Sequence, residues 1–262
     1  MIQLKTLTNL DEPTKPERIV RYLLIWCKEG FANLVVDEME IQLKKNQALT
    51  ITSGQIHFFK TIEGEIIVLE FSLDFICKDD NDIELIFHNG LFCHFGQNEV
   101  ITLTTPKAFT DILHKIEIEL KEKPYQFLIS NRSYIELLLI ELNRAKVENG
   151  DEIWKPDALF LKFLELVRTN FSNSFSLYQI AEKLQTTEAK LNELSKLHTN
   201  KTAQNIIYSL TISEAKRLLI YQNLSVKEIA YQLGFNDPFY FSNFFKKHTN
   251  TSPKVFKQNF TL

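Results

Sequence analysis

The segment from Ser225 to Lys257 constrains the fold more than any other stretch, because its apolar spacing and turn residues predict a helix-turn-helix. Apolar residues recur at helical spacing from Val226 to Leu233. Ser225 precedes them, where a hydroxyl can cap the first free backbone N–H groups. Gly234 follows, and glycine tolerates the left-handed backbone that ends a helix before a sharp turn. The sequence therefore predicts a helix that starts after Ser225 and stops at Gly234.

A second helix is predicted to begin at Pro238, because proline at the first helical position loses no hydrogen bond and Asp237 can cap the helix. Its inward face is predicted to carry Phe241, Phe244, Phe245 and His248. The opposite face has short or amide side chains at its start and lysines at its end, as a helix needs to reach base edges and phosphates in a DNA major groove. Its candidate DNA contacts are Asn236, Pro238, Phe239, Ser242, Asn243, Lys246 and Lys247.

The end of this segment predicts a third helix. Asn250 is expected to take the left-handed position after the second helix, where asparagine is the usual choice after glycine. Ser252 and Pro253 then open a last helix, in which Val255 and Phe256 are predicted to pack inward.

These residues resemble the C-terminal signature of the AraC/XylS family of bacterial transcription regulators. The matching positions are Ser225, Glu228, Ile229, Ala230, Gly234, Phe235, Asp237, Tyr240, Phe241, Phe245, Lys246, Lys247, Ser252, Pro253, Phe256 and Lys257. Asn243 stands where the family usually has Arg, and Asn250 where it usually has Gly. The first departure removes a long cation from the DNA-facing side, so the family's base preference is not carried over.

The helix-turn-helix pattern occurs twice. The sequence SLYQIAEKL, from Ser176 to Leu184, matches SVKEIAYQL about 49 residues later at every apolar position. A first recognition helix is therefore predicted from Glu188 to about His198. Its inward residues are predicted to be Leu191, Leu194 and Leu197, and its candidate DNA contacts are Ala189, Lys190, Asn192, Glu193 and Lys196.

A long helix from Thr202 to Tyr221 is predicted to connect the two units. Its roughly 20 residues span about 30 Å at about 1.5 Å per residue. One turn of B-DNA is about 34 Å, so a rigid connector of this length can hold two recognition helices in successive major grooves. Lys216 and Arg217 lie on this connector and are expected to reach the intervening phosphates.

Asn192 and Asn243 are the strongest candidates for base contacts, because an amide can pair with adenine through two hydrogen bonds. Helix capping or solvent exposure is the alternative for each. Phe239 can touch a thymine methyl group or pack in the core. Glu193 repels phosphate, so the first unit is expected to contact DNA more weakly.

The charge distribution agrees with two domains of different roles. The net charge is −3, but residues 151–262 hold 14 Lys and Arg against 10 Asp and Glu, a net of +4. Residues 1–150 hold 16 against 23, a net of −7. Phosphate binding depends on local positive charge, so the basic half can bind DNA.

The N-terminal half predicts a small β-barrel over residues 1–104. Short apolar runs from Ile19 to His88 alternate with turn signals, of which Glu29-Gly30 and Glu63-Gly64 are two, and the loop 78–82 follows. The family resemblance implies a cupin-like barrel here that senses a small molecule. The predicted fold class is α+β: a small β-barrel with two helices, then an all-α domain of two helix-turn-helix units joined by a long helix.

No metal site and no cofactor are predicted. A metal-binding cupin places paired histidines on one hairpin, and this chain has no HxH pair. His57 is expected to be a satisfied histidine at the barrel interior or rim. Zinc binding by His88, Cys93 and His94 is an alternative that lacks a fourth ligand. The three cysteines, Cys27, Cys77 and Cys93, show no CxxC spacing and are expected to be free thiols.

Two amphipathic helices are predicted over residues 105–148. The first starts after Thr105 and carries Phe109, Ile112, Leu113, Ile116 and Leu120 on its apolar face; the second carries Phe127, Leu128, Ile135, Leu138, Leu139 and Leu142. In the family, the corresponding helices often form the dimer contact, and the LLLIEL face is the candidate here. The polar segment 147–156 is the linker candidate, which places the linker at 149–156 and the DNA-binding domain at 157–262.

These features predict a cytoplasmic, sequence-specific transcription regulator that is not an enzyme. The expected partners are double-stranded DNA, a second copy of the chain and a small-molecule effector; RNA polymerase is a further candidate, and no membrane contact is expected. Two alternatives remain open: a β-barrel enzyme with a DNA-binding tail, and an N-terminal domain that serves only for dimerisation or docking. The effector and its binding residues are not predicted.

Overall fold

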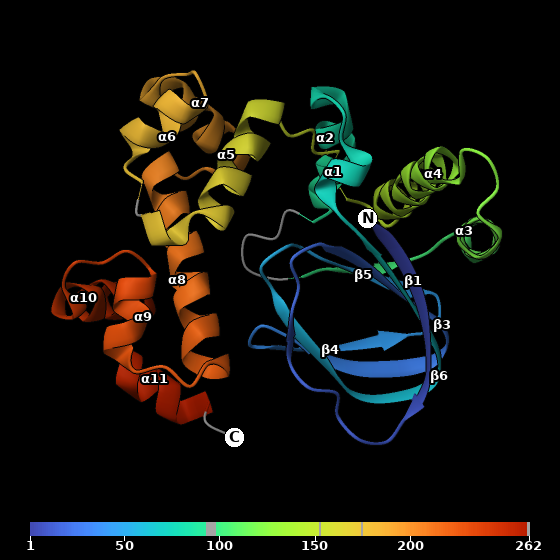
Figure 1. The fold of residues 1–262 in the computed structure, drawn as a ribbon, viewed down its shortest axis with the longest axis horizontal. Coiled ribbons are helices and arrows are strands. Elements are labelled where there is room, and N and C mark those ends of the chain that lie inside the picture. The colour runs from blue at the N-terminus through green and yellow to red at the C-terminus, as the bar shows by residue number, and fades with distance from the viewer. Residues whose placement is uncertain (93–97, 152, 174, 261–262) are drawn as a thin grey trace. The chain divides into compact units, whose positions relative to one another are not determined.

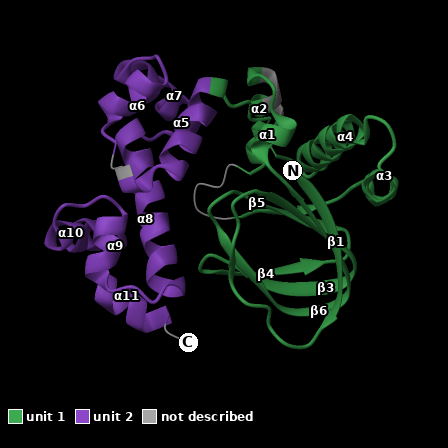
Figure 2. Cartoon of the chain, viewed as in Figure 1, with its two compact units in different colours: residues 1–158 green, residues 159–262 purple. Residues whose placement is uncertain are grey.

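The computed structural model describes residues 1–92, 98–151, 153–173 and 175–260. The chain divides into two compact units, residues 1–158 and residues 159–262 (Figures 1 and 2). The first unit contains an antiparallel sheet with helices, and the described part of the second is helical. The predicted α+β class is therefore confirmed. Among the described residues, no helix has the length and apolar character needed to cross a bilayer.

The first unit is built on a seven-stranded sheet in which every pairing is antiparallel. The main path runs β1-β6-β3-β5-β7, with β2 beside β6 and β4 beside β3. The strands are β1 (Ile2–Leu10), β2 (Glu17–Arg18), β3 (Tyr22–Val36), β4 (Met39–Lys44), β5 (Gln47–Ile51), β6 (Ile56–Phe71) and β7 (Val100–Thr102).

Two glycines allow β3 and β6 to pair along almost their whole length. Gly30 lies opposite Gly64, with φ of +75° and +95°. A Cβ on Gly30 would lie 1.9 Å from the carbonyl oxygen of Glu63, so no other residue fits without a backbone shift. The turns predicted at Glu29-Gly30 and Glu63-Gly64 are wrong: both strands continue, with a register shift after Cys27, and bend there.

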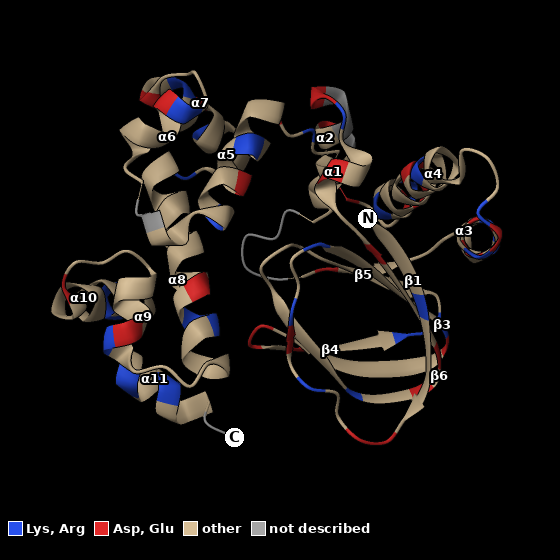
Figure 3. Cartoon of the chain, in the orientation of Figure 1, with Lys and Arg blue, Asp and Glu red and all other residues tan. Residues whose placement is uncertain are grey.

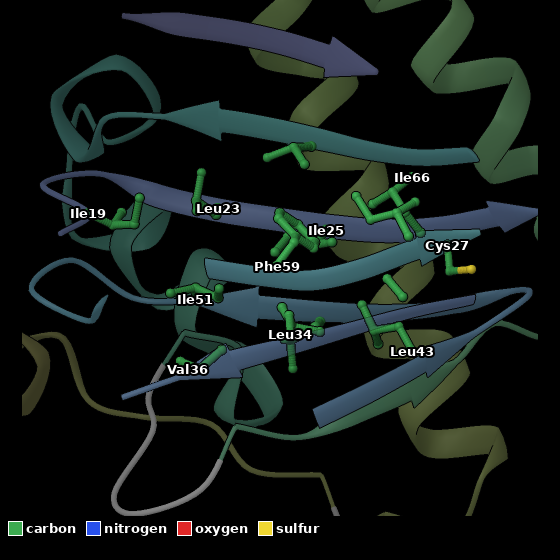
Figure 4. Packing of buried hydrophobic residues seen from close by; sticks show 14 residues of the cluster. Ile19, Leu23, Ile25, Cys27, Leu34, Val36, Leu43, Ile51, Phe59 and Ile66 are labelled. Atoms are coloured by element: carbon green, nitrogen blue, oxygen red, sulfur yellow. The ribbon is translucent and has the colours of Figure 1, made fainter. Parts of the chain in front are cut away.

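The sheet curls around an apolar core (Figures 1 and 4). Side chains from β3, β4, β5 and β6 fill most of it. Burying one large apolar side chain stabilises the folded chain by roughly 1.5–3 kcal/mol. The cluster comprises Ile19, Leu23, Ile25, Cys27, Ala32, Leu34, Val36, Leu43, Leu49, Ile51, Phe59, Ile62, Ile66 and Val68. Burial raises the pKa of the Cys27 thiol to about 11, so this free cysteine is a packing group rather than a reactive one.

Two features of this unit differ from the sequence prediction. The strand β1 was not predicted, and it covers the edge of β6 from Ile2 to Leu10. The segment after β6 was predicted to be a loop around residues 78–82, but it forms the short helices α1 (Leu73–Ile76) and α2 (Asp80–Phe87), then the 3₁₀ turn η1 (His88–Gly90). Cys93 and His94, the remaining members of the zinc alternative, lie outside the described residues.

Helices α3 (Pro106–Glu122) and α4 (Phe127–Glu148) pack against each other. Thr105 stands before α3 and Pro106 is its first residue, as predicted. In the LLLIEL segment, Leu138, Leu139 and Leu142 are fully buried within the unit. The face predicted for dimerisation is therefore largely internal. Leu128 was predicted to be buried and is exposed.

The predicted linker is anchored to the first unit. The backbone N–H of Asn89 donates to the carbonyl of Trp154 at 2.8 Å, and the backbone N–H of Trp154 donates to Asn89 Oδ1 at 2.9 Å. The buried Lys146 ammonium contacts the carboxylates of Asp151, at 2.9 Å, and Glu99. Its hydrogen bond holds the pKa of Asp151 below the ordinary value of an aspartate.

The second unit is a helical array. Its elements are α5 (Ala158–Thr169), η2 (Phe171–Asn173), α6 (Leu177–Lys183), α7 (Glu188–Thr199), α8 (Ala203–Tyr221), α9 (Val226–Gln232), α10 (Pro238–Thr249) and α11 (Pro253–Phe260). The long α8 is the predicted connector. One face of this helix is buried and carries Ile206, Leu210, Ala215, Leu218 and Leu219.

Candidate nucleic-acid interface

The two helix-turn-helix units begin with the same local structure. The hydroxyls of Ser176 and Ser225 each accept a hydrogen bond from the backbone N–H three residues later, and the side-chain oxygens of Gln179 and Glu228 accept one from the serine N–H. The Ser225 hydroxyl and N–H hold the pKa of Glu228 below its usual value. Both first helices, α6 and α9, therefore start at capping boxes.

The two turns also share a backbone conformation. Gln185 follows α6 with a φ of +53°, and Gly234 follows α9 with a φ of +76°. In both, the next residue donates its N–H to a carbonyl five residues earlier, from Thr186 to Ala181 and from Phe235 to Ala230. The repeated sequence thus produces a repeated turn, with a left-handed residue at its centre.

The second recognition helix, α10, presents one exposed face along its length. Asp237 caps the Phe239 N–H and Pro238 is the first helical residue, as predicted. Phe239 is 73% exposed, which excludes the alternative of core packing. Asn243, Lys246 and Lys247 are exposed beyond it, and Tyr240, which the sequence prediction omitted, is exposed too.

Two inward assignments near this helix are wrong. His248 was predicted to face inward; it is exposed, although its ring packs against Tyr208 and Phe244 at centroid distances of 5.3 Å and 4.7 Å. Val255 on α11 is also exposed, whereas Phe256 is buried as predicted. Asn250 does take the left-handed position that ends α10, with a φ of 62°.

The first recognition helix, α7, carries a different set of outward side chains. Leu197 was predicted to face inward and is 71% exposed. It lies 50 residues before Lys247, and Glu193 and Lys196 correspond in the same way to Asn243 and Lys246. The first helix-turn-helix therefore presents an acid and a leucine at the positions where the second helix-turn-helix presents an amide and a lysine.

The charges on α7 also neutralise each other. Lys190 Nζ lies 2.8 Å from Glu193 Oε1, and acidic and basic residues alternate on this helix (Figure 3). Alanine at position 189 offers only a methyl group. These features make α7 a weaker ligand for phosphate than α10, whose exposed end carries two lysines.

The Asn192 side chain is committed to the fold. Its Oδ1 accepts the backbone N–H of Ala203 at 3.0 Å, and its Nδ2 donates to the carbonyl of Glu188 at 3.1 Å. Ala203 is the first residue of α8, so the amide supplies one of the partners that a helix N-terminus lacks. This geometry supports the capping alternative for Asn192 over base contact.

The cations of the connector are also engaged. Arg217 pairs with the buried Glu214 at 3.1 Å, and its side chain is only 13% exposed. Lys216 Nζ lies 5.6 Å above the ring of Phe256. Both residues lie in the C-terminal half of α8, and their contacts stabilise the packing of this unit.

A small cavity lies in the first unit at the end of the sheet. Its volume is about 170 Å³, and its apolar floor includes Leu23, Phe59 and Val68. His57 at its edge is buried, as expected for a histidine at the barrel interior or rim, and among the described residues its Nδ1 has no hydrogen-bond partner. Burial lowers the pKa of His57. Among the described residues, no cluster of three or more His, Cys, Asp or Glu side chains is arranged to hold a metal ion.

Comparison with known proteins identifies the same region. A helix-turn-helix domain model matches residues 180–259. An uncharacterised HTH-type transcriptional regulator of Pseudoalteromonas carrageenovora is 38% identical over 119 residues, which cover 45% of this chain and 70% of that protein. The HTH-type transcriptional activator RhaS of Salmonella paratyphi B is 29% identical over 131 residues, 50% of this chain and 46% of RhaS. The chain thus aligns with about half the length of RhaS.

Solved structures show weaker likeness. ToxT from Vibrio cholerae O395 is 16% identical, with a TM-score of 0.44 over 99% of this chain and 98% of ToxT. The C-terminal domain of AraT from Geobacillus stearothermophilus is 23% identical, with a TM-score of 0.38 over 40% of this chain and 87% of that domain.

The paired helix-turn-helix units and the matched relatives define a DNA-binding transcription regulator of the helix-turn-helix type. The chain belongs to the AraC/XylS family, as the signature from Ser225 to Lys257 predicted. This is a family of transcription factors and not of enzymes, so the alternative of a β-barrel enzyme with a DNA-binding tail is rejected.

Proposed function

We propose that this chain regulates transcription at specific DNA sites by placing α7 and α10 in successive major grooves of one duplex. The observation that carries the proposal is the connector. Helix α8 runs unbroken for 19 residues between the two units, which corresponds to about 28 Å. A groove-to-groove step is about 34 Å. The caps at Thr202 and the buried face of α8 make this spacer rigid.

We assign base recognition mainly to α10. Asn243 is exposed at the centre of its outer face, where an amide can pair with adenine. Phe239 and Pro238 at its N-terminal end can touch thymine methyl groups, and Lys246 and Lys247 at its C-terminal end can meet phosphates. Asn236 and Ser242 complete this contact surface. Residues 159–262 hold 13 Lys and Arg against 7 Asp and Glu, a net charge of +6 that favours DNA.

The role assigned to α7 is positioning. Ala189, Glu193, Lys196 and Leu197 form its outward face, and only Lys196 on this face adds positive charge without an ion pair in the described structure. An apolar, nearly neutral face is suited to close approach in a groove and gives little electrostatic affinity. Lys216 and Arg217 are left out of the contact set because they are held in the fold.

The first unit is proposed to respond to a small molecule through the cavity beside His57. The charged residues Lys5, Lys15, Glu17 and Glu70 line it together with the buried apolar residues Leu23, Phe59 and Val68. A cavity with an apolar floor and a few polar groups is typical of ligand sites. A ligand that favours one arrangement of the regulator changes its DNA affinity by its differential binding free energy.

Dimerisation is proposed through α3 and α4, on exposed residues rather than on the buried Leu138, Leu139 and Leu142 of the LLLIEL segment. The exposed large apolar side chains of this pair and of the turn between the helices are Ile118, Tyr125, Leu128, Ile129, Leu137 and Val147. On α4, Ile129 and Val147 lie eighteen residues apart, which is five helical turns, so they lie on one line of the helix, and Leu137 lies about 80° from that line. Unpartnered apolar side chains on one face favour contact with a second copy. RNA polymerase remains a candidate partner for the DNA-bound regulator.

Selection of DNA from a random pool, followed by hydroxyl-radical footprinting of the selected site, tests the DNA-binding proposal. We expect two protected segments on one face of the duplex, with their centres about 10 base pairs apart. The segment bound by α10 should have the stronger sequence preference. A single protected segment, or no enrichment of any sequence by the full chain, would contradict the proposal.

A further inference from the structure

A second cavity lies inside the DNA-binding unit, between its two helix-turn-helix halves. Its volume is about 220 Å³. The end of α5 and the start of α6 form one wall, residues 233–244 around the second turn and α10 form another, and α8 forms the base through Ile207, Tyr208 and Thr211. All these elements belong to residues 159–262, so the cavity is a feature of one compact unit.

Aromatic rings dominate the lining. The six are Phe171, Phe175, Tyr208, Phe235, Tyr240 and Phe244. Phe244 packs against two of the other rings: its ring centroid lies 5.3 Å from that of Tyr208 and 5.3 Å from that of Phe235. Tilted and edge-on ring pairs at this distance favour a further flat ring, which can stack or meet an edge in the same way.

The polar groups of the cavity are neutral. None of the described lining residues carries a charged side chain. A charged ligand would therefore lose its hydration without gaining a counter-charge. The Gln204 amide lines the cavity and makes no side-chain hydrogen bond to the rest of the described chain. It is thus available to a ligand that carries one donor or acceptor.

We propose that this cavity binds a small, neutral molecule of one or two fused aromatic rings with a single hydrogen-bonding group. The size agrees, because an engineered apolar cavity of about 150 Å³ holds benzene and this cavity is larger. The aromatic walls select a flat shape, the lack of charge selects a neutral ligand, and Gln204 supplies one polar contact.

A ligand at this site touches both helix-turn-helix halves and the connector together. It therefore favours the relative arrangement of α7 and α10 seen here, and it changes DNA affinity to the extent that the DNA-bound arrangement differs. This coupling rests on the proposed two-groove function, whereas the binding itself does not. The site is also separate from the cavity beside His57, which belongs to the other unit.

Indole is the probe for the binding test, since it is flat, bicyclic and neutral and has one N–H donor. Titration of the full-length chain by calorimetry and saturation-transfer NMR should show one saturable site with a Kd on the order of 0.1–1 mM. Ile207→Trp fills the cavity from α8 and should weaken binding at least about tenfold. Indole-3-carboxylate, which is charged, should bind the wild-type chain at least about tenfold more weakly.

Ile153→Trp is the matched control, because it makes the same substitution on an exposed site between α4 and α5 in the other unit and should leave indole binding unchanged. Thr211→Leu is a smaller change at the cavity base and keeps the test open if Ile207→Trp does not fold. No saturable indole binding by the wild-type chain, or equal binding by wild type and both cavity variants, would overturn the proposed site.

The coupling is measured on the selected DNA site with and without saturating indole. We expect a change in DNA affinity for the wild-type chain and none for Ile207→Trp. An unchanged wild-type affinity would overturn the coupling. Loss of DNA binding in the absence of indole would instead be a failure of the two-groove proposal, which the binding titration does not use.

Discussion

Gln185 and Gly234 occupy the same place in the two turns and share a left-handed backbone, with φ of +53° and +76°. One position carries a Cβ and the other does not, although both helices before them begin with a serine capping box. A residue other than glycine in this region costs about 1 kcal/mol or more, so the first turn is held in its conformation by the packing around it.

The two turn residues give an exchange test of this equivalence. Gly234→Ala should lower the free energy of unfolding of the second unit by about 1 kcal/mol, whereas Gln185→Gly should raise it by about 0.5 kcal/mol. Urea unfolding followed by helical circular dichroism measures both. Trp26 and Trp154 lie in residues 1–158, so their fluorescence transition is the internal control and should not move. Equal losses in both variants would show that the turns are not equivalent.

Alanine substitutions of the two asparagines considered for base contact should have different effects, one on stability and the other on base preference. Asn192→Ala should cost about 1–2 kcal/mol of stability, because it leaves the Ala203 N–H without its acceptor, and it should preserve base preference. Asn243→Ala should leave stability nearly unchanged and relax the preference at one base position by about 1–3 kcal/mol.

Unfolding curves and a panel of single-base variants of the selected site measure the two effects. Lys246→Ala serves as the comparison on α10: it should weaken binding to every sequence alike and reduce the salt slope by about one unit. If Asn243→Ala and Lys246→Ala both weakened all sequences equally, Asn243 would have no base contact.

Glu193 limits the DNA affinity of the first helix-turn-helix, because it adds negative charge to the face of α7 and pairs with Lys190. Glu193→Gln should strengthen DNA binding several-fold at low salt and increase the salt slope by about one unit, since it removes a repulsion and releases a lysine. Electrophoretic titrations over a range of salt concentrations measure this change. The control Glu117→Gln on α3 removes the same charge from an exposed site in the other unit and should have no effect. Weaker binding by Glu193→Gln would point to a cytosine contact instead.

His57 should make the stability of the first unit depend on pH. Burial lowers its pKa in the folded chain, and the nearby Glu17 and Glu70 carboxylates and the Lys5 ammonium modify that effect. The unfolded imidazole has a pKa of about 6.5, so below that pH the unfolded chain binds a proton that the folded chain resists. The free energy of unfolding should therefore fall as the pH drops from 7 to 5, by no more than about 1.4 kcal/mol per pH unit, and should not gain from this group above pH 7.

The fluorescence transition of the first unit at each pH gives this profile, and His57→Gln should flatten it. The pKa of His88 is also lowered by burial, so His88 contributes to the same pH dependence of stability. His88→Gln measures that contribution. A profile unchanged by His57→Gln would mean that the pKa of this imidazole is the same in the folded and unfolded chain, which contradicts the effect of burial.

Local signals predicted the second unit well, because each acts over a few residues. The serine caps, the proline at the start of α10 and the left-handed Asn250 all lie where the sequence placed them. Leu197 was misplaced because a leucine at helical spacing is indistinguishable in sequence from a buried one, and only its relation to Lys247 shows the outward face.

The structure of the first unit was harder to predict from the sequence, because its strands pair with strands that are far away along the chain. Gly30 and Gly64 lie 34 residues apart, and their facing positions inside two long strands cannot be deduced from either neighbourhood. The role of Asn192 was left open between base contact and capping for the same reason: its acceptor role depends on where α8 begins, eleven residues later. Strand β1 depends on its pairing with β6, whose residues follow it by more than fifty positions.

Insertion of base pairs between the two halves of the selected DNA site tests the rigid two-groove arrangement most directly. About five added base pairs place the second half on the opposite face of the duplex, and about ten restore the face but double the distance. Because α8 fixes the separation of α7 and α10, both insertions should reduce the affinity of the full chain to that of a single half-site. Affinity that survives the five-base-pair insertion would contradict a rigid connector that places the two helices in successive grooves.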